Sequence, residues 1–303
     1  MEGKMKDKSR FHSGFVSIIG RPNVGKSTLI NQLLGQKLVI MSDKPQTTRN
    51  KIQCVLTREN AQIVFIDTPG IHKPLHKLGS YMVNTAINTL AEVDLILFVC
   101  DATTSPGAGD HFIVERIEQA KIPTILVLNK IDKMPKKDLM VKINEYNQLY
   151  QWEEVIPLSA LTGDNVEKLV DVIIQYLPEG PRYYPDEMIT DQPERFVVAE
   201  LIREKILKLT RDEIPHSVAI EVTEMRKKEN LDLVYVRANI YLERDSQKGI
   251  IIGKNGTMLK RIGQEAREDI ERLLGSKIYL DLWVKVKKDW RNSDFMLKDL
   301  GYN

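Results

Sequence analysis

The stretch from residue 20 to residue 27, which reads GRPNVGKS, constrains the fold more than any other part of the chain. It follows a short apolar run, Phe15–Ile19, and precedes a helix-compatible segment, Ser27–Leu34. Two glycines separated by four residues and followed by Lys-Ser are typical of a phosphate-binding loop between a buried strand and a helix. Inward-facing N–H groups and the positive end of the helix would hold a polyphosphate. The residues that we expect to contact it are Gly20, Asn23, Val24, Gly25, Lys26, Ser27 and Thr28.

Two of these side chains have separate roles. Lys26 would bring a positive charge to the β- and γ-phosphates, and the Ser27 hydroxyl can ligate Mg²⁺.

Length and composition predict an ordinary two-domain protein. The chain has 303 residues, of which 42% are hydrophobic and 28% charged, with a net charge of +2. Its two cysteines, Cys54 and Cys100, lie in apolar runs and are expected to be core side chains. The first ten residues are charged, and no uncharged apolar run is long enough to span a bilayer, so we expect a cytoplasmic protein without a signal peptide or transmembrane segment.

Between residues 15 and about 177, short apolar runs alternate with helix-compatible segments. The expected strands are 15–19, 63–66, 95–100, 124–128 and 155–158, and the expected helices lie near 76–91, 110–120, 138–150 and 165–176. Near-continuous apolar runs are typical of parallel strands buried on both faces. Residues 51–57 should pair with the strand at 62–67 as a hairpin. The pattern predicts a three-layer α/β domain with its ligand at the carboxyl ends of the strands.

Polar residues follow the second of these runs. Asp67-Thr68-Pro69-Gly70 comes directly after the strand 63–66. An aspartate that ends a strand beside a phosphate loop is placed to hold Mg²⁺, and the N–H of Gly70 can approach a γ-phosphate. We therefore expect Asp67 to join Ser27 as a metal ligand.

Residues 129–132, which read NKID, follow another strand and predict a guanine site. The Asp132 carboxylate accepts hydrogen bonds only, and guanine presents adjacent N–H donors on its Watson–Crick edge. Asn129 would brace the base and the surrounding loops, and the Lys130 stem would cover one face of the base. After the next strand, Ser159-Ala160-Leu161 can supply a backbone N–H to the guanine oxygen.

The polar, proline-containing stretch 42–49, which reads SDKPQTTR, is expected to be the first switch loop. A threonine here can close onto Mg²⁺ and the γ-phosphate when GTP is bound. We favour Thr48 over Thr47 for this role.

The second switch loop, residues 70–80, contains His72 and His76. A general-base role for either histidine is secondary to the simpler interpretation that both are solvated.

The composition changes past residue 177, where prolines at 178, 181, 185 and 193 interrupt the chain. The following order of helix, strand, strand, helix, helix and strand is that of a bacterial-type (type II) KH domain. Its G-x-x-G segment, Ile252-Gly253-Lys254-Asn255-Gly256, would clamp a nucleic-acid backbone. Basic residues exceed acidic ones from Arg244 to Arg291. Near the end of this stretch, basic residues are interleaved with an aromatic one: Lys285, Lys287, Lys288 and Trp290. Proteins that bind single-stranded nucleic acid use this combination.

The predicted fold is thus an α/β P-loop (Ras-like) GTPase domain followed by a smaller α+β KH domain of type II. The expected organisation is a charged extension (1–13), the GTPase domain (14–178), a proline-rich linker (179–193), the KH RNA-binding domain (194–291) and a C-terminal tail (292–303).

Taken together, these motifs closely resemble those of the Era family of GTPases, over residues 14–302. The resemblance implies a ribosome-assembly GTPase that binds the 3′ end of the small-subunit ribosomal RNA in a nucleotide-dependent manner. It also implies that the second threonine of the switch pair, Thr48, ligates Mg²⁺. Members of the family can also associate peripherally with the inner membrane.

The sequence departs from Ras-type GTPases after Gly70, where Ile71 replaces the glutamine that would orient the attacking water. The residues expected to assist hydrolysis are therefore Lys26, Thr48, Gly70 and Asn23. Related GTPases with the same asparagine use K⁺ beside the phosphates, and Asn23 either does so here or only shapes the turn.

Two other functions are compatible with parts of the sequence. One is an RNA-binding module in which the nucleotide domain is mainly structural. The other is a TrmE-like partner in RNA modification, a function that would require a cofactor domain with a reactive cysteine.

Overall fold

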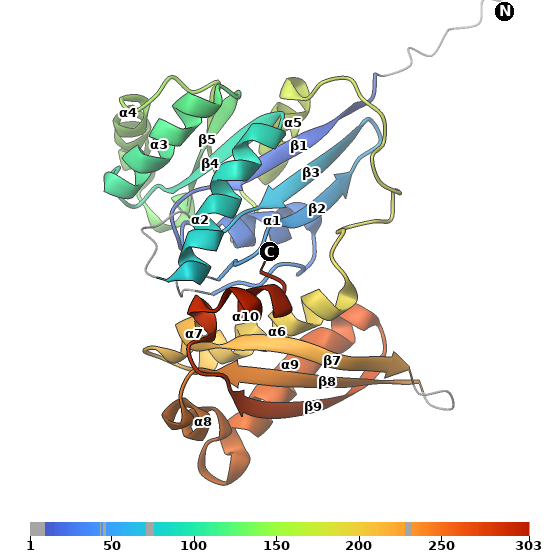
Figure 1. Ribbon diagram of the computed structural model, residues 1–303. Coiled ribbons are helices and arrows are strands. Elements are labelled where there is room, and N and C mark those ends of the chain that lie inside the picture. The colour runs from blue at the N-terminus through green and yellow to red at the C-terminus, as the bar shows by residue number, and fades with distance from the viewer. Residues whose placement is uncertain (1–9, 43, 45–46, 71–75, 228–231, 303) are drawn as a thin grey trace, which may run out of the picture. The chain divides into compact units, whose positions relative to one another are not determined.

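The structure, a computed structural model, describes residues 10–42, 44, 47–70, 76–227 and 232–302. It divides into two compact units (Figure 1). The first contains residues up to 37, 51–71 and 85–191, and the second contains 38–50, 72–84 and 192 onward.

The first unit is built on a six-stranded sheet in the order β2-β3-β1-β4-β5-β6. All neighbours are parallel except β2 and β3, which form the expected antiparallel hairpin. The strands are β1 (His12–Ile19), β2 (Ile52–Thr57), β3 (Ala61–Asp67), β4 (Leu95–Asp101), β5 (Thr124–Asn129) and β6 (Glu154–Pro157). Every residue of β3 and β5 is buried, because helices cover both faces of the sheet.

Helices complete the three layers. They are α1 (Lys26–Leu34), α2 (Lys77–Thr89), α3 (Ala108–Ala120), α4 (Leu139–Asn147) and α5 (Val166–Tyr176); α2 begins in the second unit and ends in the first. Buried residues of α2, α3 and α4 share one core with β4 and β5, whereas α1 and α5 contact each other. The predicted α/β class is confirmed. Single turns of 3-10 helix lie at Leu90–Glu92, Ile131–Lys133 and Lys136–Asp138.

The proline-rich segment after α5 packs against the β2–β3 hairpin. The buried Gln62 side chain accepts hydrogen bonds from Tyr183 N (2.7 Å) and Tyr184 N (3.0 Å) and donates one to Tyr184 O (2.9 Å). The Tyr184 hydroxyl donates to the Gln53 side chain at 2.7 Å. These bonds satisfy the buried amide and hold the segment in place.

The second unit contains a three-stranded sheet in the order β7-β8-β9, with β7 (Ala219–Lys227) antiparallel to β8 (Leu233–Leu242) and β8 parallel to β9 (Lys277–Val286). Its helices are α6 (Glu194–Leu209), α7 (Ile214–Ser217), α8 (Asp245–Ile252), α9 (Thr257–Leu274) and α10 (Asp294–Asp299), with 3-10 turns at Lys254–Gly256 and Trp290–Asn292. The order α6, β7, β8, α8, α9 and β9 is the order of elements expected for a type II KH domain, with the short helix α7 added between α6 and β7.

The segment 38–50 belongs to this second unit, and its backbone is hydrogen-bonded to α6. Glu204 of α6 accepts a hydrogen bond from Met41 N at 2.9 Å, and Arg203 donates one to Thr47 O. Arg49 is 1% exposed and donates to Val218 O at 2.7 Å and to Pro215 O at 3.2 Å.

An aromatic cluster closes the core beside Arg49. Trp290 and Tyr302 stack with ring centroids 6.1 Å apart, and they pack with Leu78, Met82, Ala219, Tyr241 and Leu297. The Arg49 guanidinium lies 5.8 Å from the centre of the Trp290 ring. The chain end thus contributes side chains to the core of this unit. Among the described residues, no helix is both long and apolar enough to cross a membrane.

Candidate nucleotide site and nucleic-acid interface

The loop between β1 and α1 has the backbone that a phosphate-binding loop requires. Gly20 and Gly25 have positive φ angles of 153° and 103°, and Asn23 has φ 65°. A Cβ at Gly20 would lie 2.3 Å from Val99 O, and one at Gly25 would lie 2.2 Å from the Asn129 side-chain nitrogen. Both glycines are therefore needed for conformation and for space.

Lys26 begins α1 and lies across this loop. Its Nζ donates to Gly20 O at 3.0 Å and to Arg21 O at 2.9 Å, and the side chain is 7% exposed. Burial lowers the pKa of Lys26 from its ordinary value to about 8, although the nearby Asp67 acts in the opposite direction. A phosphate bound beside the ammonium would raise this pKa again.

The two expected metal ligands of the first unit lie together. The Ser27 hydroxyl lies 3.5 Å from Asp67 Oδ2, at the carboxyl end of β3. Asp67 and Thr68 are fully buried, and the Thr68 hydroxyl donates to Ile18 O at 3.0 Å. A hydroxyl and a carboxylate beside a phosphate loop are the hard oxygen ligands that Mg²⁺ prefers.

Gly70 lies against the phosphate-binding loop, as expected. A Cβ there would be 3.2 Å from both the ring and the nitrogen of Pro22, so the backbone approaches the loop closely. Thr48, the third expected metal ligand, is 7% exposed and belongs to the second unit. Gln46, Ile71 and His72 lie outside the described residues.

Asn129 joins three loops of the nucleotide site. Its side-chain amide donates to Val24 O at 2.8 Å, and its side-chain oxygen accepts from Lys130 N (2.8 Å) and Ala160 N (2.9 Å). The expected bracing role of Asn129 is thus matched by bonds to the phosphate-binding loop and to the loop after β6. In this structure the Ala160 N–H, one of the expected donors to guanine, is directed to Asn129.

The side chains expected to bind the base are also held by hydrogen bonds. The Ser159 hydroxyl donates to Asp132 Oδ1 at 2.6 Å. Lys130 has φ 69°, and its ammonium donates to Asn23 O (2.7 Å) and pairs with Asp101 Oδ2 (2.7 Å). Lys130 and Asp132 thus both follow β5, whereas Asp101 ends the neighbouring strand β4.

Two contributors to this site were not predicted from the sequence. Asp101 ends β4 and orients Lys130. Burial raises its pKa, yet hydrogen bonds from Lys130 and Thr103 outweigh this and hold the pKa below its usual range. Arg21 of the phosphate-binding loop pairs with the buried Asp110 at 3.0 Å. The position of Asp101 at a strand end is the signal that would have identified it.

In the second unit, the G-x-x-G segment turns between α8 and α9. Gly253 has φ 72°, and a Cβ there would lie 2.8 Å from the Cβ and N of Met258. Gly256 has φ 76° with open space around it, and Asn255 adopts φ 52°. Lys254 and Asn255 are exposed at the tip, and Ile252 is half-buried behind them.

A groove of about 480 Å³ continues from this turn between α9 and β9. Leu259, Leu280 and Leu282 supply its apolar surface, and Lys260 and Arg267 its charge. An apolar groove with a cationic rim beside a backbone clamp can hold unstacked bases and their phosphates.

The four other residues expected to bind RNA lie in different surroundings. Lys285 and Lys288 are exposed, whereas Lys287 is half-buried, 4.3 Å from the centre of the Tyr241 ring. Trp290 is fully buried and donates its indole N–H to Ser217 O at 2.9 Å. This placement is incompatible with the expectation that Trp290 stacks on RNA, because the ring is part of the core.

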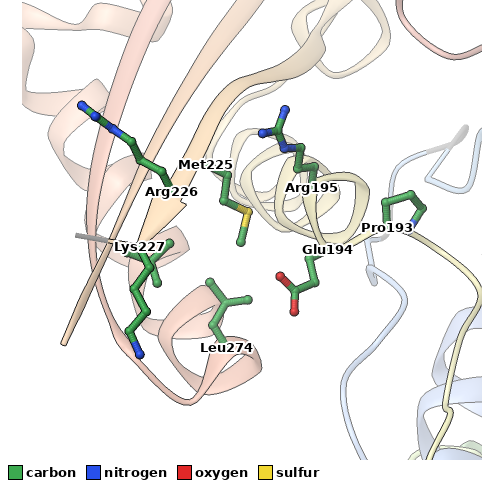
Figure 2. A pocket seen from close by; sticks show the side chains of 8 residues that line it. Pro193, Glu194, Arg195, Met225, Arg226, Lys227 and Leu274 are labelled. Carbon is green, nitrogen blue, oxygen red and sulfur yellow. The ribbon is translucent and has the colours of Figure 1, made fainter. Parts of the chain in front are cut away.

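A second pocket, of about 460 Å³, lies at the far end of α9 (Figure 2). Met225 and Leu274 point into it, whereas Arg226 points away. Arg226 pairs with Glu224 at 2.8 Å and Lys227 with Asp232 at 3.5 Å. We assign no ligand to this pocket.

Two protein families match the chain. The 50S ribosome-binding GTPase family matches residues 15–130, which contain the phosphate-binding loop and the first two residues of the NKID motif. The KH domain family matches residues 213–291, which contain the G-x-x-G turn and the groove.

Individual relatives match nearly the whole chain. GTPase Era of Alkaliphilus oremlandii is 60% identical over 293 residues, which cover 97% of this chain and 99% of that protein. A crystal structure of an Era variant from Aquifex aeolicus bound to GDP and AlF4⁻ has a TM-score of 0.93 and 43% identity. A structure of Era with MgGDPNP and nucleotides 1506–1542 of 16S ribosomal RNA has a TM-score of 0.94 and 43% identity. Both comparisons cover 96% of this chain and 99% of the other. The chain belongs to the Era family of GTPases.

Proposed function

We propose that this GTPase binds the 3′ end of the small-subunit ribosomal RNA through its KH unit, in a nucleotide-dependent manner, during assembly of the small ribosomal subunit. The observation that carries the proposal is the presence of two ordered sites in one chain. Hydrogen bonds hold Asn129 and Asp132 at the end of β5 where guanine is expected, and a G-x-x-G turn opens onto a groove. The relative solved with 16S ribosomal RNA supports the choice of RNA.

Mg²⁺ is the metal that we assign to the nucleotide site. The Ser27 hydroxyl and Asp67 carboxylate fit it as oxygen ligands, and Thr48 is the proposed third ligand from the switch segment. The relative solved with MgGDPNP supports this choice. When bound, the metal supplies positive charge to the β- and γ-phosphate oxygens.

The chain's own residues would then stabilise the transition state. Lys26 would neutralise charge on the transferred phosphoryl group, and the Gly70 N–H would donate a hydrogen bond to it. Asp132 selects guanine by accepting from both N–H donors of its edge, with Ser159 holding the carboxylate. Because Ile71 has no group that can orient water, the intrinsic rate should be low.

Asn23 is the proposed ligand for a K⁺ ion beside the phosphates. The left-handed backbone of Asn23 and the hydrogen bond from Lys130 to its carbonyl support this assignment. We expect GTP turnover to be faster in KCl than in NaCl at equal ionic strength, and Asn23→Ala to remove the difference. Equal wild-type rates in both salts would leave Asn23 with the turn-shaping role only.

The experiment for the main proposal tests the functions of the two units separately in the full-length protein. Wild-type protein should hydrolyse GTP but not ATP and should bind an RNA with the 3′-terminal sequence of 16S ribosomal RNA more tightly with GTP than with GDP. Replacing both Lys254 and Asn255 by Asp should abolish RNA binding through repulsion of phosphates while preserving GTP affinity, because both side chains are exposed. RNA affinity that is indifferent to this change would exclude the groove. Absence of GTP turnover would favour a structural nucleotide domain.

The proposed location is the cytoplasm. Peripheral association with the inner membrane stays a prediction from the resemblance alone, and vesicle co-sedimentation of the purified protein would test it.

A further inference from the structure

The two halves of the phosphate-binding loop are held by different side chains. Asn129 and Lys130 donate hydrogen bonds to carbonyls of the half that leads into α1, at 2.8 and 2.7 Å. The other half contains the carbonyl of Arg21, which accepts a hydrogen bond from Lys26 Nζ at 2.9 Å. The direction of the Lys26 ammonium therefore depends on where the backbone of Arg21 lies.

The side chain of Arg21 extends from the loop to the start of α3. Its Nε atom pairs with Asp110 Oδ1 at 3.0 Å, and its Nη2 atom donates a hydrogen bond to the Thr104 hydroxyl at 3.2 Å. Asp110 is fully buried in the first turn of α3, whereas the Arg21 side chain is 29% exposed. The ion pair thus joins the phosphate-binding loop to a buried point at the end of a helix.

The Asp110 carboxylate is itself fixed from a second side. The N–H of Gly107 donates a hydrogen bond to Asp110 Oδ2 at 2.8 Å, so the two carboxylate oxygens have different partners. The positive end of α3 also favours a negative charge at this position. A buried carboxylate with both oxygens engaged has one orientation, and it holds the guanidinium that pairs with it.

The glycine at position 109 leaves room for the stem of Arg21. A Cβ there would lie 2.9 Å from Arg21 Cδ and 3.3 Å from its Cγ, so a larger residue would displace the stem. The stem therefore lies directly against the backbone of α3, where it has little freedom to move.

The charge of Arg21 is compensated by Asp110, so its effect on a nucleotide is expected to come through its backbone rather than through its guanidinium. Holding the side chain at Asp110 also holds the carbonyl of the same residue, and this carbonyl orients the Lys26 ammonium. We propose that Arg21, anchored by Asp110, is a positioning residue that directs Lys26 at the transferred phosphoryl group.

The positioning role rests on the function proposed for Lys26 and predicts a loss in the chemical step. Backbone N–H groups of the loop also hold the phosphates of the ground state, whereas the charge that Lys26 would neutralise grows during transfer. A displacement of about 1 Å in such a group can slow a reaction about a hundredfold. Arg21→Met should therefore lower the single-turnover rate of GTP hydrolysis about 10- to 100-fold. The KM for GTP and the Kd for GDP should change less than about threefold.

Loss of the arginine also leaves the buried Asp110 without its cation, which should lower the melting temperature. The double variant Arg21→Met, Asp110→Asn separates this structural effect from the positioning effect. Its melting temperature should return close to that of wild type, because no unpaired charge stays buried. Hydrolysis should stay as slow as in Arg21→Met, because the loop has still lost its anchor. Arg21→Lys should recover part of the rate, since an ammonium can still pair with Asp110.

Arg116→Met is the matched control. Arg116 is an exposed arginine of the same helix, where it donates a hydrogen bond to Gln119 at 2.9 Å and lies over the Phe112 ring. Its substitution should change neither the hydrolysis rate nor the melting temperature. Lys26→Met, measured at the same KCl and MgCl2 concentrations, should abolish hydrolysis.

The outcomes distinguish positioning from structure. If the double variant regains both the melting temperature and the rate of wild type, the ion pair is structural only. If Arg21→Met raises the Kd for GDP as much as it lowers the rate, the pair shapes ground-state binding and does not position Lys26. A wild-type rate in Lys26→Met would remove the role of Lys26 and the positioning role with it. An inactive Lys26→Met beside an unchanged rate in Arg21→Met would refute the positioning role alone.

Discussion

At the scale of single residues, Asp132 is the proposed determinant of the choice of base. Ser159 donates a hydrogen bond to one of its carboxylate oxygens. In Asp132→Asn, one acceptor becomes a donor and opposes a guanine N–H. We expect GTP affinity to fall about ten- to hundredfold, the range for hydrogen bonds to a charged group. Competition between GTP and XTP should show that xanthine binding improves in the variant, and unchanged GTP affinity would contradict the assignment.

Lys26 gives the site a predictable pH dependence. Its pKa in the nucleotide-free protein is about 8 because of burial, below the ordinary lysine value, and bound phosphates should raise it. At a pH between the Lys26 pKa of the free protein and that of the GTP complex, Lys26 should take up a proton when GTP binds. The affinity for GTP should therefore fall as the pH rises above 8. Calorimetry near pH 8.5 in buffers of different ionisation enthalpy measures the uptake.

Lys26→Met is the control for this measurement and should abolish the proton uptake.

The stability of the nucleotide-free protein should show the opposite dependence on pH. Above pH 8 the unfolded state binds more protons at this lysine than the folded state does, so the free energy of unfolding should rise with pH until the unfolded lysine also deprotonates. A nucleotide affinity that is constant from pH 7 to pH 10 would show that Lys26 remains charged.

At the scale of elements, the segment 38–50 is held by the second unit through specific bonds. Glu204 and Arg203 of α6 bind its backbone at Met41 and Thr47, and Arg49 inserts into the core. Thr48, the expected metal ligand, adjoins Arg49 in the chain. A rearrangement of Thr48 on GTP binding must therefore strain or release the Arg49 contacts.

Arg49→Ala should lower the free energy of unfolding by about 2–4 kcal/mol, because it leaves buried carbonyls of residues 215–218 without a donor and a cavity beside Trp290. Urea denaturation followed by tryptophan fluorescence measures the change. Arg58→Ala, which removes an ion pair between 40%- and 79%-exposed side chains, is the control and should cost under about 0.5 kcal/mol. Equal midpoints for the two variants would refute the anchoring role of Arg49.

Elements with local signals were predictable from the sequence. Strands of continuous apolar residues, the phosphate-binding loop and the α9 helix have strong periodicity or spacing. The burial of Arg49 and Trp290 had no such signal, since their partners lie far away in the chain.

At the scale of the whole molecule, the second unit is not a continuous piece of chain. Its aromatic cluster includes Leu78 and Met82 of α2 together with Trp290 and Tyr302. A fragment of residues 192–303 should therefore expose apolar surface, bind a hydrophobic dye and melt at a lower temperature than the same unit in the full chain. Calorimetry of both proteins tests this. A fragment that melts at the full-chain temperature and binds no dye would show that the early segments are dispensable.

The discontinuity of the second unit also sets an order of events during synthesis. Residues 38–50 and 72–84 leave the ribosome well before residues 192–302, against which they pack. At ordinary elongation rates, roughly 5 to 20 s separate residue 84 from residue 192. During this interval the nascent nucleotide domain carries two segments whose native partners do not yet exist. Factors that meet the nascent chain therefore encounter Arg49, Leu78 and Met82 before the KH unit buries them.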